Sequence, residues 1–133
     1  EHRDNYNIPV IAITGSNGKT IVKEWLNQLL ENEHSICRSP KSYNSQIGVP
    51  LSLFNLGPDH SLGIFEAGIS RPDEMQVVSQ MIRPTIGILT NIGDAHAAHF
   101  DNDEQKFREK WKLFDSAENI VGFCDGHWFG WLS

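Results

Sequence analysis

Short apolar runs rich in β-branched residues recur along this chain. The clearest is the unbroken run at residues 10–14, which is typical of a strand buried on both faces of a parallel sheet. Similar runs predict strands over residues 61–68, 85–93 and 119–124, and a shorter strand over residues 34–39.

Between these runs, apolar residues recur at helical spacing instead. They predict helices over residues 20–32, 47–56, 71–83 and 102–117. Proline supports the starts of the second and third helices, because a missing N–H costs nothing in a first turn (Pro50, Pro72). Strands and helices that alternate in this way predict βαβ units. We therefore expect an α/β fold with a mostly parallel sheet flanked by helices on both faces.

Length and composition add a size and a class to this prediction. With 133 residues, 39% of them hydrophobic and 21% charged, the chain has the makeup of one soluble globular domain. No apolar run is long enough to span a membrane, and residues 1–9 lack the pattern of a secretory signal, so a cytosolic location is expected. The two cysteines, Cys37 and Cys124, stand in separate apolar contexts and are expected to be free buried thiols.

The net charge limits the ligands that the chain can bind. A formal charge of −6 argues against a nucleic-acid surface, since such domains carry a basic excess. A nucleotide remains compatible, because one lysine, backbone N–H groups and a divalent cation can hold a triphosphate on an acidic protein.

The segment "TGSNGKT", which follows the first predicted strand, has the chemistry of a phosphate loop. Gly15 and Gly18 allow a tight turn and a close approach to an anion, and the next helix offers unpaired N–H groups. Lys19 can reach the β and γ phosphates, and the Thr20 hydroxyl can bind Mg²⁺. The general pattern G-x-x-x-x-G-K-S/T requires a first glycine where this chain has Ile13, so a plain glycine turn is the alternative.

Polar residues also follow the other predicted strands, where the carboxyl ends of a parallel sheet meet. Glu66 follows an apolar run, and it is either a loop acid or a metal ligand. In "TNIGDAHAAHF", the residues Asp94, His96 and His99 are loop residues or ligands of a second ion, and nearby oxygens would favour Mg²⁺ or Mn²⁺.

Two further groups of residues have an ordinary and a functional interpretation. Lys106 and Lys110 lie one turn apart on a predicted helix, and a solvated helix face is the ordinary explanation for both. Before another helix, Asn44, Ser45 and Gln46 could cap that helix or present polar groups to a ligand.

Taken together, these motifs resemble the central ATP-binding domain of the Mur ligases, the ATP-dependent amide ligases of peptidoglycan synthesis. "TGSNGKT" is similar to that family's phosphate loop, G-S/T-N-G-K-S/T, which lacks the first glycine of the general pattern. "FEAG" resembles its E-x-G segment, and "TNIGDAHAAHF" resembles its T-N-I/V-x-x-x-H-x-x-x-F segment. The resemblance covers about residues 9–125 and implies a P-loop NTPase-like fold.

Within the family, "YNSQIGVPLSL" is most similar to the N-N-x-I-G-V-P-L segment of the members that add D-alanyl-D-alanine to UDP-MurNAc-tripeptide, although Ser45 replaces an asparagine. The resemblance implies that residues Gly15, Ser16, Asn17, Gly18, Lys19 and Thr20 bind ATP. It also implies one Mg²⁺ on Thr20 and Glu66, and a second cation, Mg²⁺ or Mn²⁺, on His96 and a carbamylated Lys110. Asn44 and Ser45 are candidates for substrate binding.

The chain is short for such an enzyme. We expect residues 1–133 to be part of a Mur ligase central domain, without the UDP-sugar-binding amino-terminal domain and the carboxyl-terminal domain. One alternative is a related ligase, either a diaminopimelate- or lysine-adding Mur enzyme or a folylpolyglutamate synthase. Another is a nucleotide-binding module or an inactive fragment.

Overall fold

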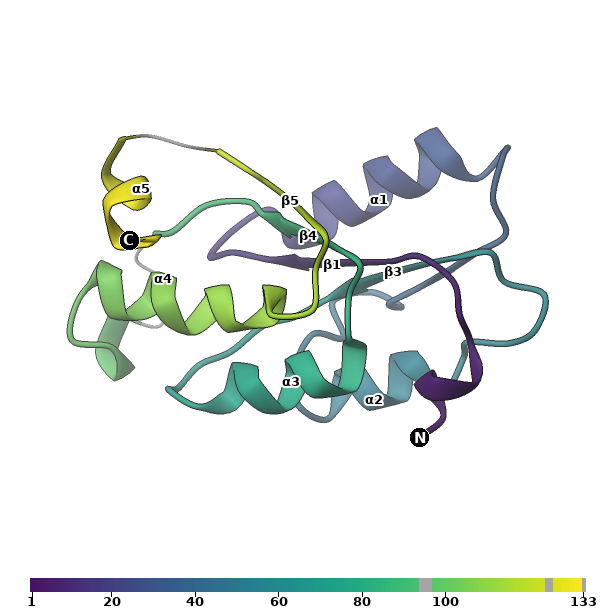
Figure 1. Cartoon of the computed structure of the whole chain (residues 1–133), viewed down its shortest axis with the longest axis horizontal. Helices are drawn as coiled ribbons and strands as arrows, with labels where there is room; N and C mark the ends of the chain where they lie inside the picture. The colour runs from purple at the N-terminus through teal and green to yellow at the C-terminus, as the bar shows by residue number, and fades with distance from the viewer. Residues whose placement is uncertain (94–96, 124–125, 133) are drawn as a thin grey trace.

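The computed structural model describes residues 1–93, 97–123 and 126–132, which form a layered α/β structure (Figure 1). Five parallel strands make one sheet in the order β2-β3-β1-β4-β5. The strands are β1 (Val10–Thr14), β2 (Ile36–Arg38), β3 (Leu62–Glu66), β4 (Ile86–Leu89) and β5 (Asn119–Gly122). All five predicted strands are present, and the predicted parallel sheet is confirmed.

Helices cover both faces of this sheet. On one face lies α1 (Lys19–Leu30), and on the other lie α2 (Gly48–Leu53), α3 (Glu74–Ile82) and α4 (Asp103–Trp111) (Figure 1). Three 3-10 turns, Arg3–Asn5, Ala97–His99 and Lys112–Phe114, and a short helix α5 (Gly126–Leu132) complete the described elements. None of the helices in the described ranges is long and apolar enough to cross a bilayer.

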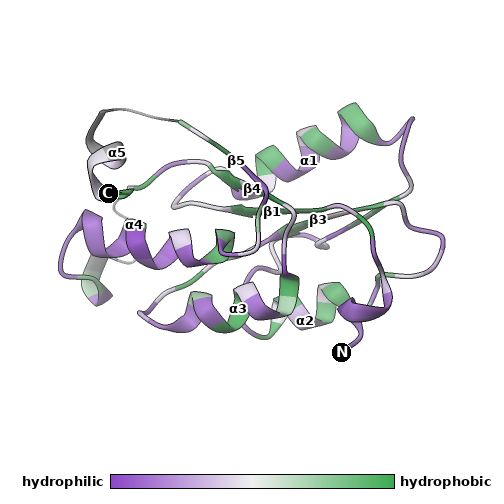
Figure 2. Ribbon diagram, in the orientation of Figure 1, coloured by the Kyte–Doolittle hydropathy of each residue, from purple (hydrophilic) through white to green (hydrophobic). Residues whose placement is uncertain are grey.

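The central strand β1 divides its side chains between two cores. Ile11 and Ile13 point toward α1, where they pack with Val22, Leu26 and Leu30. Val10 and Ala12 belong to a larger core beneath α2, α3 and α4. Figure 2 shows hydrophobic residues on the central strands and on parts of α1, α2 and α3. A strand covered on both faces is apolar at successive positions, because neighbouring side chains point to opposite faces.

The register of the sheet brings the carboxyl ends of three strands together. In the register of the sheet, Ile13 lies beside Glu66, and Thr14 lies beside Leu89. The phosphate-loop segment, the end of β3 and the end of β4 therefore meet at one edge of the sheet, as the parallel arrangement predicts.

Some predicted boundaries were wrong by a few residues. The helix predicted over 71–83 begins at Glu74, because Asp73 before it has a left-handed backbone (φ 69°) and Pro72 lies in the preceding turn. The Glu74 carboxylate turns back to accept the N–H groups of Ser70 and Arg71 at 2.6 and 3.1 Å. The helix predicted over 102–117 ends at Trp111 and continues as a 3-10 turn.

The carboxyl-terminal aromatic residues form the helix α5, for which the sequence pattern gave no prediction. Trp128 and Trp131 pack against Phe107 of α4, with ring centroids 5.9 and 5.5 Å away. By contrast, three of the apolar residues that predicted α1 are exposed along its outer side, namely Ile21, Trp25 and Leu29.

Candidate active site at the carboxyl edge of the sheet

The "TGSNGKT" loop connects β1 to α1, and both of its glycines have backbone angles that favour glycine. Gly15 has φ 142°, and a Cβ there would collide with the Thr90 hydroxyl. Gly18 has φ 83° and is the N-cap of α1, so the chain turns directly into the helix. The loop therefore packs closely against the segment after β4, and Gly15 makes this contact possible.

The loop amides fall into two groups. Asn91 accepts the N–H of Ser16 with its backbone oxygen (2.9 Å) and the N–H of Asn17 with its side-chain oxygen (3.0 Å). For the N–H groups of Gly18, Lys19 and Thr20, no residue in the described ranges is an acceptor. The start of α1 therefore presents the amides and the positive dipole end that can hold an anion.

Lys19 lies beside these amides. Its ammonium donates to the Gly15 carbonyl at 2.9 Å, so the side chain folds over the loop. Burial lowers the pKa of Lys19, and the nearby Glu66 carboxylate partly opposes this effect. The Lys19 ammonium and the free amides at the start of α1 can therefore contact the same anion.

The Glu66 side chain is fully buried at the end of β3 and has three partners. The Thr20 hydroxyl donates to both carboxylate oxygens, at 2.9 and 3.1 Å, and Lys23 forms a 2.8 Å ion pair with Oε2. Asn44 donates to Oε1 at 3.5 Å. A buried carboxylate requires such partners, since an unpaired charge is costly to remove from water.

The donor chemistry of this corner fits a magnesium nucleotide. Thr20 and Glu66 provide oxygen ligands beside a free helix start, and Mg²⁺ commonly binds one or two protein oxygens together with phosphates and water. No cluster of three or more His, Cys, Asp or Glu side chains suited to a metal exists among the described residues. A cation at Thr20 and Glu66 would therefore take its remaining ligands from a bound phosphate and from water.

The segment after β4 is fastened to the phosphate loop. Thr90 donates to the Asn17 carbonyl at 2.6 Å, and the Ser16 hydroxyl accepts the N–H of Gly93 at 2.9 Å. Lys106 of α4 in turn donates to the Gly93 carbonyl. Of the candidate ligands farther along, Asp94 and His96 lie outside the described residues, and His99 is exposed on the Ala97–His99 turn.

Lys106 and Lys110 are both 2% exposed, so the interpretation of a solvated helix face was wrong for both. No partner within the described ranges forms a hydrogen bond or an ion pair with the Lys110 ammonium, unlike that of Lys106. Burial, Lys19 and Lys106 together lower the pKa of Lys110 to about 8. Lys110 is therefore a buried amine whose neutral fraction near physiological pH is far larger than that of an ordinary lysine.

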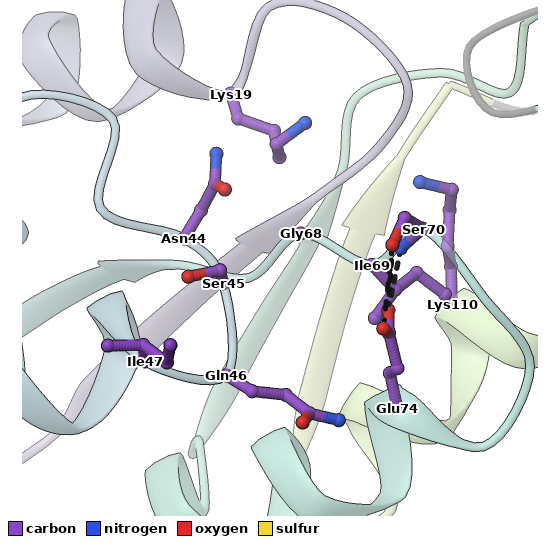
Figure 3. A pocket seen from close by; sticks show the side chains of 10 residues that line it. All are labelled: Lys19, Asn44, Ser45, Gln46, Ile47, Gly68, Ile69, Ser70, Glu74 and Lys110. Carbon is purple, nitrogen blue, oxygen red and sulfur yellow. Dashed lines mark hydrogen bonds between the residues drawn. The ribbon is translucent and has the colours of Figure 1, made fainter.

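A cavity of about 360 Å³ lies between Lys19 and Lys110 (Figure 3). Lys19 of α1 and Lys110 of α4 line it from different sides, and the segment before α2 contributes Asn44 and Ser45. Ser45 also accepts the N–H of Gly48 at 3.1 Å, which supports the capping interpretation for this residue. The remaining lining residues are Gln46, Ile47, Gly68, Ile69, Ser70 and Glu74.

Two features of this site were missed by sequence reasoning. Glu74 lines the cavity, but its signal was only that of an acid in a first helical turn. Lys23 is fully buried against Glu66, and its signal was a charged residue on the sheet-facing side of α1, beside Val22 and Leu26. That position could have been recognised, because a lysine on a buried helix face requires a partner.

Comparison with known proteins places this arrangement in a family. Residues 13–127 match the family model of the Mur ligase middle domain. The chain is 39% identical over 114 residues to the UDP-N-acetylmuramoyl-tripeptide--D-alanyl-D-alanine ligase of Treponema pallidum (strain Nichols), covering 85% of this chain and 25% of that protein. It is 40% identical over 103 residues to the ligase of the same name from Borreliella burgdorferi, covering 77% and 22%.

Solved structures agree with these relatives. MurF from Thermotoga maritima, in complex with ADP, superposes with a TM-score of 0.85 at 29% identity, covering 94% of this chain and 31% of that one. MurF from Acinetobacter baumannii gives a TM-score of 0.83 at 25% identity, covering 94% and 33%. The chain thus spans about a quarter of the length of the curated relatives and a third of the solved chains. It belongs to the Mur ligase family, with residues 13–127 matching the family's middle domain.

Proposed function

We propose that the protein to which this chain belongs is an ATP-dependent ligase of peptidoglycan precursor synthesis, which adds D-alanyl-D-alanine to UDP-MurNAc-tripeptide in the cytoplasm. The relatives named for this reaction support the proposal. The observation that carries it is the contact between the Thr20 hydroxyl and the Glu66 carboxylate at 2.9 Å, beside the free amides at the start of α1. This corner has the ligands of a magnesium nucleotide site.

The reaction would proceed through an acyl phosphate. The terminal carboxylate of the tripeptide attacks the γ-phosphorus, the bond to the bridging oxygen breaks, and ADP leaves. The amine of D-alanyl-D-alanine then attacks the acyl carbon, and the tetrahedral intermediate expels phosphate and loses a proton to leave the amide. The protein has to align the carboxylate with the phosphorus and to neutralise negative charge.

Residues of the phosphate loop carry the charge neutralisation in this proposal. The segment Gly15–Gly18 wraps the phosphates, with the N–H groups of Gly18, Lys19 and Thr20 as the donors that have no other acceptor in the described structure. The Lys19 ammonium contacts the β and γ oxygens, and Thr20 and Glu66 hold Mg²⁺, or Mn²⁺ in its place.

Lys110 has a second role in the proposal. Its neutral amine attacks CO₂ and releases a proton, which gives an anionic carbamate at the cavity wall. The lowered pKa and the lack of a described partner for the ammonium support this modification. Together with His96, the carbamate would hold the second cation. Asn44 and Ser45 at the same cavity would contact the acceptor substrate.

Residues 1–133 would be part of the central domain, with the UDP-sugar-binding and carboxyl-terminal domains supplied by the remaining length of the protein. The share of the relatives that this chain spans favours a second candidate for the isolated chain, a nucleotide-binding module without ligase activity. Other Mur-type ligases and folylpolyglutamate synthases differ from the main proposal in the amino-acid substrate.

Two measurements separate these candidates. Calorimetric titration of the chain with a non-hydrolysable ATP analogue, with and without Mg²⁺, should show Mg²⁺-dependent binding; no binding would contradict a functional nucleotide site in this chain. The full-length protein should release phosphate from ATP only when UDP-MurNAc-tripeptide and D-alanyl-D-alanine are both present. Turnover with diaminopimelate, lysine or glutamate in place of the dipeptide would assign it to another ligase.

A further inference from the structure

Lys23 is the most completely buried cation of the described chain, and the proposed chemistry does not use it. It lies one helical turn after Lys19 on α1, and its side chain is 0% exposed. Its ammonium contacts Glu66 Oε2 at 2.8 Å and the Ser39 carbonyl at 2.7 Å, and it also donates to the Lys41 carbonyl. The Glu24 carboxylate is 3.5 Å away.

These contacts exhaust the capacity of the ammonium. A lysine has three N–H donors, and Glu66, Ser39 and Lys41 provide three close acceptors. Lys23 has no exposed surface through which it could meet a ligand, and it does not line the cavity. Any effect on the site must therefore act through the groups that it holds.

The first of these groups is the Glu66 carboxylate. Lys23 engages Oε2, Asn44 donates to Oε1 at 3.5 Å, and the Thr20 hydroxyl lies 2.9 Å from Oε1 and 3.1 Å from Oε2. Because an ion pair fixes one oxygen, the carboxylate cannot rotate freely about its last bond. Oε1 is the carboxylate oxygen that the Lys23 ion pair leaves free, so it is the atom that a cation beside Thr20 would meet.

The second group is the turn after β2. Lys41 has a left-handed backbone with φ 50°, which is unusual for a residue with a side chain, and its carbonyl points to Lys23. The same segment is tied to β3 by the Ser39 hydroxyl, which accepts the Glu66 N–H at 2.9 Å, and by the Asn44 carbonyl, which accepts the Gly68 N–H at 2.6 Å. Lys23 therefore holds the base of the segment that brings Asn44 to the cavity.

We infer that Lys23 is a positioning residue that fixes two parts of the site at once. These are the Glu66 carboxylate beside Thr20, with Oε1 left free of an ion pair, and the Ser39–Asn44 segment, with Asn44 toward the cavity. The part that concerns a cation rests on the proposed function. The part that concerns the segment rests only on the contacts of the ligand-free protein. Partners of metal ligands commonly matter in this way, with losses of about 10- to 100-fold in metal affinity when they are removed.

The test compares Lys23→Met with Asn27→Ala, a matched change at the next buried polar position of α1. Asn27 contacts Glu31 and Arg38 but not Glu66, so its loss perturbs the same helix without touching the site. In the ligand-free protein, Lys23→Met should speed up hydrogen exchange relative to the wild type. The increase should be larger at the Glu66 and Gly68 amides than at the β1 core amides. Asn27→Ala should change all these amides alike.

The second readout is Mg²⁺ titration at a fixed concentration of the ATP analogue. Lys23→Met should lower the affinity for Mg²⁺ by about ten-fold or more. The affinity for the analogue in EDTA should change by less than about two-fold. Unchanged Mg²⁺ affinity in a folded variant, or uniform exchange, overturns the inference. If the wild-type chain binds no analogue, the proposed function fails, and exchange alone decides the role of Lys23.

Loss of a buried ion-pair partner can also unfold a protein. In that case the double variant Lys23→Met with Glu66→Gln is compared with Glu66→Gln alone, since both then lack the buried carboxylate charge. Faster exchange at the Gly68 amide in the double variant supports a direct hold of Lys23 on the Ser39–Asn44 segment. Equal exchange in the two variants overturns it.

Discussion

The side-chain oxygen of Asn91 accepts the backbone N–H of Asn17 at 3.0 Å, which joins the segment after β4 to the phosphate loop. The backbone oxygen of the same residue accepts the Ser16 N–H at 2.9 Å. One residue thus holds two consecutive amides of the loop, and it leaves the next three amides to face a ligand. The motif that follows β4 is therefore part of the phosphate site through its backbone as well as its side chains.

Replacing Asn91 with Ala should weaken nucleotide binding by loosening this loop. We expect a loss of stability of about 1 kcal/mol for the missing hydrogen bond and several-fold weaker binding of the ATP analogue, because part of the binding energy would be spent on ordering the loop. Thermal unfolding and calorimetric titration measure the two effects. Asn55→Ala, an exposed asparagine at the end of α2, is the control; equal effects of both changes would contradict a specific role for Asn91.

Lys19 should matter for function far more than for folding. Its ammonium has one backbone partner, the Gly15 carbonyl, so Lys19→Ala is expected to change the free energy of unfolding by less than about 1 kcal/mol. In the full-length protein the same change should lower kcat for ligation by about 100-fold or more, as the loss of a charge-stabilising donor does. Near-normal turnover would rule out the assigned role. Arg108→Ala, which removes an exposed i,i+4 ion pair on α4, should leave turnover intact.

The sheet and the placement of Glu66 could be predicted because both depend on local patterns. Parallel strands buried on two faces are continuous apolar runs, and their carboxyl ends meet at one edge, so Glu66 beside the phosphate loop followed from topology. The strand predicted over 85–93 ends at Leu89. The Thr90 N–H still donates to Thr14 of β1, but the Thr90 hydroxyl, Asn91 and Gly93 bond to the phosphate loop. These contacts involve residues more than seventy positions apart and have no local signal.

The burial of three lysines also depends on contacts between distant residues, which have no local signal in the sequence. The segment around Lys106 and Lys110 is rich in charge, so a solvated helix face was the simpler interpretation. Both side chains are buried because α4 packs beside the segment after β4 and the cavity, and Lys106 finds the Gly93 carbonyl there. Lys23 was missed for a similar reason, since its partners come from β3 and from the turn after β2.

The lowered pKa of Lys110 predicts how stability depends on pH. The folded protein releases this proton near pH 8, while the unfolded chain releases it near 10.5, so the unfolded state binds more protons between these values. The contribution of Lys110 to the free energy of unfolding should therefore rise with pH from about 8 to 10.5, by at most about 1.4 kcal/mol per pH unit. Lys110→Met should remove this rise, and urea unfolding at pH 7, 8 and 9 would detect it. Parallel pH dependence in both proteins would contradict the burial of a titrating amine.

The same pKa predicts that Lys110 reacts with CO₂. At pH 7 a pKa near 8 leaves about 10% of the amine neutral, against well under 0.1% for an unperturbed lysine. With ¹³C-labelled bicarbonate, we expect a carbamate signal that strengthens as the pH is raised toward 8 and is missing in Lys110→Met. A signal that persists in Lys110→Met would assign the carbamate to another amine.

The carboxyl-terminal helix gives a prediction that is independent of the active site. Trp131 packs edge-on against Phe107, which belongs to the main core, whereas Trp25 on α1 is 63% exposed. Trp131→Ala should therefore destabilise the chain by about 1–3 kcal/mol, below the value for a fully buried aromatic because the ring is only partly covered. Trp25→Ala should change stability by less than about 0.5 kcal/mol. Urea unfolding monitored by circular dichroism compares the two, and equal stability of both variants would show that α5 does not add to the core.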